Sequence, residues 1–320
     1  MTAFDLPSSP RLLLDATLTP VQGSRFQPTG FPDVGPGVYT LPNGDDQLLV
    51  ESAQSVANRL EAACWDEAAM DLVAPLRGLP YVRVNDAEGR LLTTSVLEAH
   101  RLNSAYIEKS DFKATLEAAI DFDDARPFDR RKLVAALAKF DIGCLVHGVF
   151  LESIAGVLRI PRALSGFIEA SGVNRVSTGG VKNDRVQAKK DEDSNLTATE
   201  GFGNVPFHRT EFVATEITAY FSLDLEQIRN YRLNDAMNRL LFALSVFKVR
   251  RFLETGLRLR TACDLQAGEL RVKKPSGFGL PSLSEVTEHL PSLISAARES
   301  FASPPVTVAV FNKPSKKKPS

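Results

Sequence analysis

The sequence has few of the residues on which metal sites, disulfide frameworks and membrane spans depend. Its three cysteines, Cys64, Cys144 and Cys263, are far apart and lack the C-x-x-C spacing of a zinc site, so we expect reduced core residues. No apolar run approaches the roughly 20 residues of a membrane helix. Residues 1–5 lack the basic and apolar regions of a signal peptide. These absences predict a cytoplasmic protein with no membrane partner.

Signatures of common enzyme classes are also missing. No G-x-x-x-x-G-K-[ST] phosphate loop occurs, because Gly179-Gly180-Val181-Lys182 has neither that spacing nor the hydroxyl residue that would reach Mg²⁺. There is no G-x-S-x-G elbow, and none of the four histidines identifies a base for a nucleophile. We therefore predict no catalytic residue, no cofactor and no enzymatic activity.

One acidic segment could in principle hold Mg²⁺ for phosphoryl chemistry. Arginines are interspersed in this segment, and aspartates between helices usually cap the next helix or form ion pairs. We favour capping and ion pairing, and predict no metal site. The aspartates are Asp121, Asp123, Asp124 and Asp129.

The net charge of −1 excludes a chain that is basic throughout, so a surface for a polyanion would require segregated charge. Such segregation is present. Residues 1–160 carry 15 basic and 22 acidic side chains, whereas residues 161–320 carry 23 basic and 17 acidic ones. The second half is therefore the candidate for binding a polyanion.

The basic half begins inside the stretch 142–207. Residues 142–151 form a mostly apolar run rich in Val and Phe, which predicts a buried core strand. Cations then alternate with Gly, Ser and Asn, and residues 187–204 are almost wholly polar. A charged, glycine-bearing excursion suits nucleic acid, because phosphates interact with many exposed donors. The alternative is a surface loop with no binding role.

Other cationic positions extend this candidate surface. Arg25 lies in a Gly/Pro-rich loop over 22–42, and His147 lies within the predicted strand. His208 and Arg209 follow the polar insertion where it rejoins the predicted sheet. Arg258 and Arg260 belong to a basic region that a solvated helix end explains only in part.

Hydrophobic periodicity predicts an α+β fold of the RNA-recognition-motif (ferredoxin-like) type, in which helices cover one face of an antiparallel sheet. A helical insertion is expected over 65–141. The tail 313–320 is too short and too rich in Pro and Lys to fold, so we expect disorder there. Strands are predicted at 11–18, 81–84, 142–151, 212–223 and 306–311, and helices at 53–64, 95–106, 111–120, 130–140, 233–247 and 283–301.

Two segments, DIGCLVHGVFL (141–151) and LRIPRALSGFIEASGVNRVSTGGVKNDR (158–185), resemble the core of the CRISPR-associated RAMP superfamily. RFQPTGFPD (25–33) and LVESAQSVANRL (49–60) fit the same family, so the resemblance covers nearly the whole chain. It is nearest to the backbone subunit of the type I-G (formerly I-U) Cascade complex. One departure is the glycine-rich loop of RAMP proteins, which is reduced here to Gly277-Phe278-Gly279.

The resemblance implies a single RAMP domain over 1–320, with a palm and a thumb hairpin. The palm strands would be 11–18, 142–151, 212–223 and 306–311, and the thumb would lie within 174–206. Several copies would line up along one guide RNA. Implied partners are the CRISPR guide RNA, target DNA paired to it, further copies of the chain, the large subunit and the repeat-processing RAMP subunit.

The predicted function is therefore a non-catalytic backbone subunit that polymerises along guide RNA through phosphate contacts and presents it for target pairing. One alternative is a metal-dependent ribonuclease of the RAMP type, with Asp184 or the acidic segment as its catalytic carboxylates. The other is a protein scaffold without nucleic acid. The predicted RNA-binding residues are Arg25, His147, Arg162, Arg175, Lys182, Arg185, His208, Arg209, Arg258 and Arg260.

Overall fold

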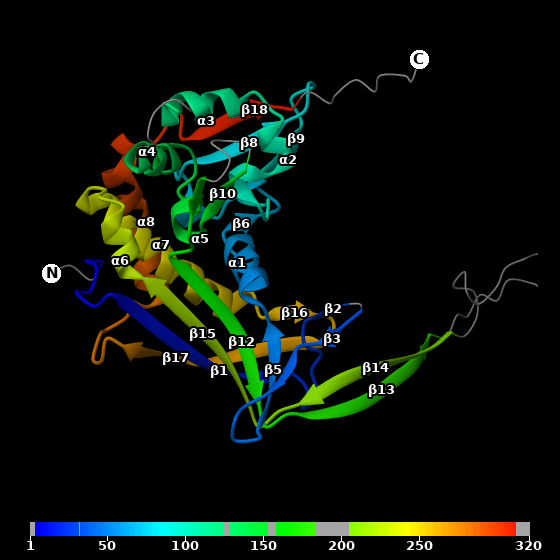
Figure 1. The fold of residues 1–320 in the computed structure, drawn as a ribbon. Helices are drawn as coiled ribbons and strands as arrows, with labels where there is room; N and C mark the ends of the chain where they lie inside the picture. The colour runs from blue at the N-terminus through cyan, green and yellow to red at the C-terminus, as the bar shows by residue number, and fades with distance from the viewer. Residues whose placement is uncertain (1–3, 32, 124–128, 153–157, 183–204, 312–320) are drawn as a thin grey trace, which may run out of the picture.

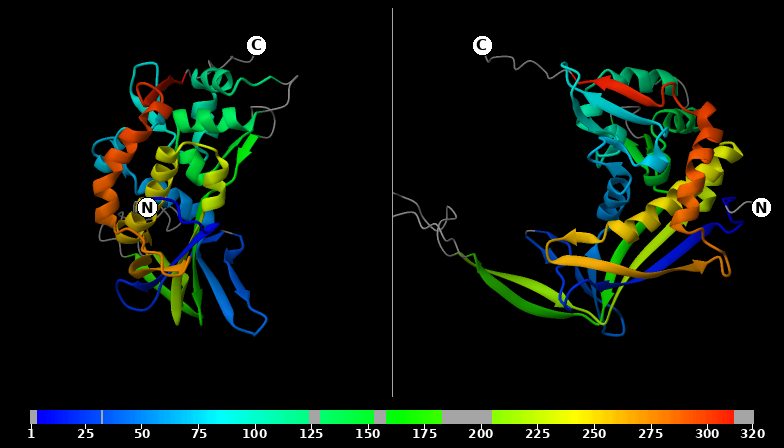
Figure 2. Two further views of the ribbon diagram at one scale, coloured as in Figure 1. Left: turned by 90° about the vertical axis from the view of Figure 1, so that its left-hand side faces the viewer. Right: turned by 180° about the vertical axis from the view of Figure 1, so that it is seen from behind.

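The computed structural model describes residues 4–31, 33–123, 129–152, 158–182 and 205–311. Within them, the chain forms a large antiparallel sheet with helices on one face, a smaller sheet beyond those helices, and a hairpin that projects from the main body (Figures 1 and 2). This arrangement confirms the α+β class predicted from the sequence.

The main sheet has seven strands, and every pair of neighbours is antiparallel. In spatial order they are β16 (Arg258–Arg260), β17 (Cys263–Lys274), β1 (Arg11–Pro20), β15 (Glu216–Asp224), β12 (Leu164–Ser171), β5 (Asp46–Glu51) and β4 (Val38–Thr40). β12 and β15 pair without a shift from Leu164 opposite Leu223 to Ser171 opposite Glu216. Alternate residues of both strands are buried, because successive side chains point to opposite faces.

Helices α1 (Ala53–Ala62), α7 (Asp235–Thr255) and α8 (Leu283–Ala297) belong to the helical layer. α7 is buried on nearly all sides in its middle, because it packs against β17 and against both other helices. The caps agree with the predicted starts: Ser52 accepts from the Ser55 backbone amide, and Asn234 accepts from that of Met237. The predictions of these three helices are therefore confirmed.

A smaller sheet contains β18 (Val306–Val310), β8 (Tyr81–Asn85) and β9 (Leu91–Thr94), with β18 parallel to β8. Shorter helices and turns are η1 (Ala74–Leu76), η2 (Arg101–Asn103), α2 (Ala105–Glu108), α3 (Phe112–Ile120), α4 (Arg130–Phe140), α5 (Gly143–His147), α6 (Leu225–Asn230) and η4 (Arg298–Ser300). Two-stranded pairs are β2 (Gly30–Phe31) with β3 (Gly35–Pro36), β6 (Trp65–Asp66) with β7 (Asp71–Leu72), and β10 (Val149–Leu151) with β11 (Leu158–Ile160).

The segment 65–141 is only partly the helical insertion that the sequence predicts. α3 and α4 lie where helices were predicted, and β8 covers the predicted strand at 81–84. The helix predicted over 95–106 is wrong, since this stretch holds turns, η2 and the start of α2. Arg101 has a φ of 50°, which no α-helix accommodates, and its side chain is buried in an ion pair.

The core strand predicted over 142–151 is also wrong. The first part forms α5, and only β10 is extended, outside the main sheet. Gly148, with a φ of 78°, ends the helix. A short buried apolar run does not by itself distinguish a helix from a strand, which explains the error. In the main sheet, β12 lies beside β15, the middle strand.

Two further palm predictions need correction, whereas the strand predicted at 11–18 is confirmed as β1. The strand predicted at 212–223 is two strands, since β15 starts only at Glu216 and residues 212–213 belong to the projecting hairpin. The strand at 306–311 exists as β18, but it lies in the smaller sheet. On the side away from β15, β1 pairs with β17. The sequence of β17 is rich in basic side chains, which are typical of a charged surface segment, and the strand was therefore not predicted.

A buried polar cluster joins α1, η2, α5 and α7. Arg101 donates from Nε to Glu61 Oε1 at 2.9 Å, and Lys248 Nζ lies 2.9 Å from His147 Nε2. All four residues are at most 4 % exposed. Burial raises the pKa of Glu61 to about 7, with Asp141 adding to the rise and the charges of Arg101 and Lys248 opposing it. The cluster therefore makes folding sensitive to pH.

We expect the Glu61→Gln variant to reveal this dependence. A carboxyl group whose folded pKa is about 7, raised from an ordinary value of 4.5, stabilises the fold below pH 4.5 and loses that contribution as pH rises to 7. The free energy of unfolding of the natural chain, relative to the variant, should fall by about 2 to 3 kcal/mol across this window. Urea denaturation at several pH values measures it, and a difference that stays constant or rises would contradict the assignment.

Candidate nucleic-acid interface

A long hairpin connects β12 to β15 and projects away from the main sheet (Figures 1 and 2). Its strands β13 (Asn174–Lys182) and β14 (Val205–Val213) pair without a shift over their whole length. At its root, Phe26 and Phe212 exchange backbone hydrogen bonds of 2.9 and 2.8 Å, and both side chains are buried. Because an isolated hairpin is marginally stable, this buried root fixes the direction of the hairpin. The insertion predicted over 174–206 corresponds to it, although β14 extends further.

The hairpin carries cations on both faces. By strand register, Arg175 and His208 lie on one face and Arg209 on the other, and the side chains of Arg175 and His208 are exposed. The Arg209 guanidinium lies 5.1 Å from the centre of the Phe207 ring, a cation–π contact. A Cβ on Gly180 would come within 3.1 Å of that ring, so the glycine leaves room for it. Phe207 is nevertheless 46 % exposed.

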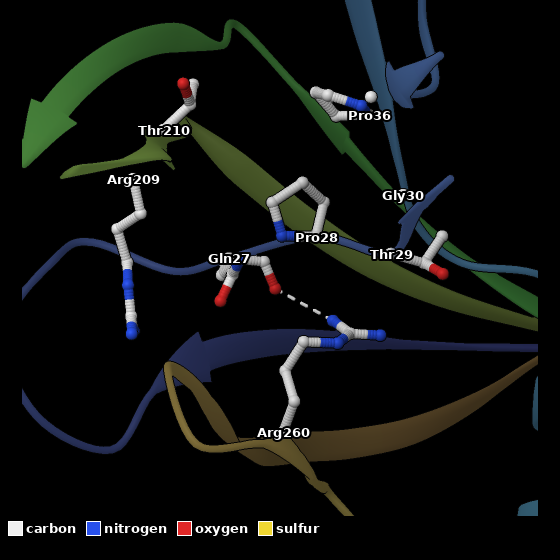
Figure 3. Close-up of a pocket in the computed structure, with 9 residues that line it drawn as sticks. Gln27, Pro28, Thr29, Gly30, Pro36, Arg209, Thr210 and Arg260 are labelled. Atoms are coloured by element: carbon white, nitrogen blue, oxygen red, sulfur yellow. Dashed lines mark hydrogen bonds between the residues drawn. The ribbon is translucent and has the colours of Figure 1, made fainter. Parts of the chain in front are cut away.

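A hollow of about 520 Å³ opens at the hairpin root (Figure 3). Arg209 from β14 and Arg260 from β16 reach it on either side of Gln27. Arg260 makes internal contacts, since it donates to the Gln27 carbonyl at 2.8 Å and pairs with buried Glu51. Arg209 has no ion pair among the residues that the structure describes. The hollow is also lined by residues 28–30, Gly35, Pro36 and Thr210.

A second hollow of about 470 Å³ lies nearby, between residues 21–25 and residues 261–264. Arg25 contributes a guanidinium that is 55 % exposed and 3.0 Å from the carboxylate of Glu211 on β14. Arg258 lines the same hollow, is exposed, and forms no ion pair within the described part of the chain. The two hollows surround the hairpin root with guanidinium groups.

The structure thus divides the predicted RNA-binding residues into two groups. His147 and Arg162 line a different hollow, before the start of β12. The backbone of Lys182 ends β13, and Arg185 lies outside the described residues. The group at the hairpin and its root is Arg25, Arg175, His208, Arg209, Arg258 and Arg260.

Sequence reasoning missed three residues that take part in these sites. Phe207 was not selected, although its position two residues before Arg209 on a strand signals a shared face. Arg101 and Arg159 line the hollow with His147 and Arg162. Arg159 lies only three residues before Arg162, in the same basic stretch, whereas Arg101 comes from a segment far away in the sequence. No local pattern signals that contact.

The aspartates of the acidic segment have the local roles that the sequence favours, so far as the structure describes them. Asp129 caps α4 by accepting from the Arg131 backbone amide at 2.8 Å, and Asp121 pairs with Lys132. Asp124 lies outside the described residues, as does Asp184. No group of three or more His, Cys, Asp or Glu side chains suited to a metal occurs among the residues described.

The prediction that the three cysteines are core residues is confirmed, and all three are free in the structure. Their burial raises the pKa of each thiol. Among the helices described, none is both long enough and apolar enough to cross a membrane.

Comparison with known proteins bears on this architecture. The family model for "CRISPR-associated protein GSU0053" matches residues 12–175, which run from β1 into β13 and make up just over half of the chain. The chain belongs to this family. Membership confirms the resemblance to CRISPR-associated RAMP proteins that the sequence predicts. No curated protein matches the chain.

Two solved structures are similar to the chain in outline. A chain of "CRISPR RNA-guided surveillance complex, pre-nicking" has 13% identity and a TM-score of 0.42, with 90% of this chain and 89% of that one covered. Csc2 of Thermofilum pendens has 10% identity and a TM-score of 0.33, with 91% and 81% covered. At these TM-scores, neither likeness establishes a function.

We expect Arg260 and Arg258, two residues apart on β16, to differ in their effect on stability. Arg260→Ala removes the closest partner of the Glu51 carboxylate, which is 2 % exposed, and should cost about 2 to 3 kcal/mol. Arg258→Ala removes an exposed side chain and should change stability by less than about 0.5 kcal/mol. Urea unfolding compares the two variants, and equal losses would contradict the internal role of Arg260.

Proposed function

We propose that the chain is a non-catalytic backbone subunit of a type I-G CRISPR interference complex. It polymerises along guide RNA through phosphate contacts and presents that RNA for pairing with target DNA. The observation that carries the proposal is a projecting hairpin, rooted among arginines, in a chain of a CRISPR-associated family. Further copies of the chain, the large subunit and the repeat-processing RAMP subunit are its proposed protein partners.

The phosphate contacts are assigned to Arg175, Arg209 and Arg258. None of the three forms an ion pair among the residues described, so their guanidinium groups are available to a ligand. Arginine binds phosphate through paired N–H donors without reading the base. A subunit that must hold any guide sequence requires such contacts, since base pairing then supplies the specificity.

The order of four central strands supports an RNA-recognition-motif palm within a single RAMP domain over 1–320. In space the order is β17-β1-β15-β12, and along the chain α1 lies between β1 and β12 while α7 lies between β15 and β17. This is the βαββαβ arrangement of ferredoxin-like folds. The hairpin, the proposed thumb, is inserted between the second and third strands of that unit.

Two features support assembly of copies along the RNA. Phe207 and Val181 are 46 % and 60 % exposed on opposite faces of a hairpin that projects from the body, so each face offers an apolar side chain to a partner. The acidic first half and basic second half of one chain also suit a contact with the opposite half of the next. A head-to-tail contact of this kind produces an open helical array.

The phosphate contacts are tested by the salt dependence of RNA binding. The logarithm of affinity for single-stranded RNA should fall by about 0.7 per logarithm of salt for each phosphate contacted. Replacing Arg175, Arg209 and Arg258 by Gln should therefore reduce the slope by about 2, whatever the RNA sequence. A control variant replaces the exposed Arg90, Arg131 and Arg298 and carries the same charge change. Equal slopes in the two variants would remove the hairpin root from the interface.

Assembly is tested at Phe207. Phe207→Ser removes the ring beneath Arg209 but leaves its charge, so it should weaken binding of one copy to a short RNA by no more than about 3-fold. Each contact between copies should weaken by about 2 kcal/mol, or roughly 30-fold. Electron microscopy and sedimentation on long RNA measure the assembly. Leu92→Ser, which changes a 43 % exposed side chain on β9, is the control. Normal arrays formed by the Phe207 variant would argue against hairpin-mediated assembly.

The absence of catalysis is tested directly. Labelled guide and target RNA should remain intact with the protein in Mg²⁺ or Mn²⁺, because Asp121 and Asp129 already serve in an ion pair and a helix cap. Replacing Asp123, Asp124 and Asp184 by Asn should change RNA affinity by no more than a few fold. Cleavage that disappears in one of these variants would support the ribonuclease alternative instead.

A further inference from the structure

A hollow of about 400 Å³ lies where α5 and β11 meet the start of β12. None of the residues that line it is acidic. Three arginines and two histidines line it together with polar and apolar groups. The polar lining residues include Gln54, His100, Arg101, His147, Arg159 and Arg162.

His147 presents a hydrogen-bond donor that lacks a partner. The side chain is 1 % exposed, and its Nε2 lies 2.9 Å from Nζ of Lys248. An ammonium group can only donate, so Nε2 accepts, and the neutral ring carries its proton on Nδ1. Burial lowers the pKa of His147 well below its ordinary value, and the charges of Lys248, Arg101 and Arg162 lower it further. Nδ1 is buried without a hydrogen-bond partner among the residues described.

Two of the three arginines add donors that no ion pair occupies among the residues described. Arg162 is half-buried and donates to the side-chain oxygen of Gln54, but it forms no ion pair within the described chain. Arg159 lies 5.2 Å over the ring of Phe150, and its guanidinium is likewise without an ion pair there. Arg101 is occupied by Glu61. A guanidinium has five N–H donors, so Arg162 retains several for a ligand.

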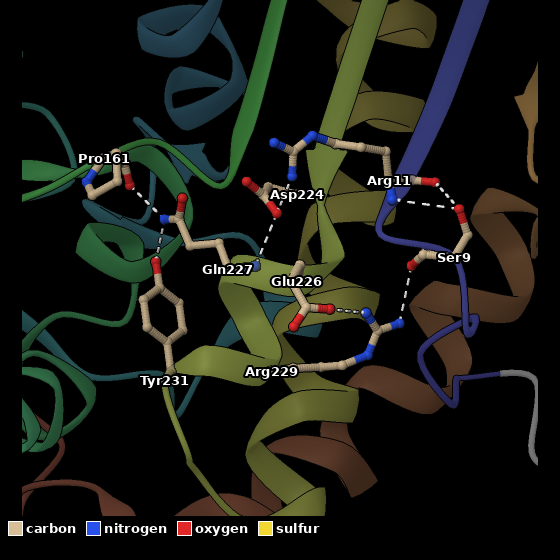
Figure 4. A network of polar contacts seen from close by, with 8 residues as sticks. All are labelled: Ser9, Arg11, Pro161, Asp224, Glu226, Gln227, Arg229 and Tyr231. Carbon is tan, nitrogen blue, oxygen red and sulfur yellow. Dashed lines mark hydrogen bonds and ion pairs between the residues drawn. The ribbon is translucent and has the colours of Figure 1, made fainter.

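The walls of the hollow are held in place by packing and hydrogen bonds. A Cβ on Gly148 would come within 2.6 Å of the Ile160 carbonyl oxygen, so the two backbones touch. Gln227 on α6 donates to the Pro161 carbonyl at 2.6 Å, next to Arg162, and lies beside Tyr231 (Figure 4). The donors are therefore positioned before a ligand arrives, which lowers the entropic cost of binding.

We propose that this hollow binds one phosphate group, with the Arg162 guanidinium and the Nδ1–H of His147 as donors and Arg159 as a neighbouring cation. A site with several donors, excess positive charge and no acidic lining suits a phosphate oxygen cluster. The phosphate can belong to RNA or to a small phosphorylated compound. The RNA form rests on the proposed function: the hollow lies at the opposite end of β12 from the hairpin, and eight strand residues span about 25 Å. Guide RNA would then be held at two points.

Inorganic phosphate is the first probe. At constant ionic strength, phosphate replacing chloride should raise the melting temperature by about 3 °C at a concentration roughly ten times the dissociation constant. Arg162→Gln should abolish this rise, and Arg159→Gln, which changes an exposed side chain, should reduce it. Arg131→Gln removes the same charge from a side chain that is 83% exposed on α4, and should leave the rise intact.

The donor role of His147 can be tested separately by NMR spectroscopy. With only four histidines in the chain, ¹⁵N spectra of labelled protein can assign His147 by comparison with His147→Gln. We expect the Nδ1-protonated tautomer, and a change in the Nδ1 signal on addition of phosphate. An Nε2-protonated ring, or a signal that phosphate leaves unchanged, would overturn the donor role of His147.

RNA binding identifies the source of the phosphate. If it is RNA, Arg162→Gln should lower the salt slope by about 0.7. If phosphate stabilisation depends on Arg162 but the slope is unchanged, the site takes a small phosphorylated compound. Absence of both effects overturns the phosphate site. Failure of the natural chain to bind RNA at all would reject the proposed function, while Arg162-dependent stabilisation by phosphate would still support this site.

Discussion

The pairing of β12 with β15 is the constraint on which the rest of the structure depends. Its register runs without a shift along the whole of β12, and a slip by one residue would turn every buried side chain of the strand to the opposite face. The β12–β15 pairing also fixes the positions of both candidate sites. Its one end leads into the hairpin, and its other end begins at the hollow that holds Arg162. The core therefore fixes the positions of both candidate surfaces.

The helical layer connects the main sheet to the smaller one through charged as well as apolar contacts. α7 supplies Lys248 to His147, and α1 supplies Glu61 to Arg101. Buried charges require well-formed partners to offset the loss of hydration, so the Glu61–Arg101 ion pair and the Lys248–His147 hydrogen bond tie these elements to specific positions. The hollow at α5 therefore depends on α7, which contributes no residue to its lining, and on α1, which contributes Gln54.

Much of the fold could be predicted because its signals are local. Ser52, Asp129 and Asn234 cap helices that begin where the hydrophobic period begins. The failures arose where distant partners decide the structure: Arg101 turns inward to reach Glu61, and β17 is a strand only because β1 lies beside it. The candidate site shows the same difference between local and distant signals. The composition of the sequence indicates the cationic hairpin, whereas the grouping of Arg101 with His147 and Arg162 depends on the tertiary fold.

The buried root at Phe26 and Phe212 has a geometric consequence for any assembly. It sets the angle between hairpin and sheet in each copy. In a head-to-tail array this angle recurs at every joint, so a small rotation at the root accumulates along the polymer and sets its pitch. The rigidity of the contact between Phe26 and Phe212 would then determine whether the pitch of the array matches the helical path of the RNA.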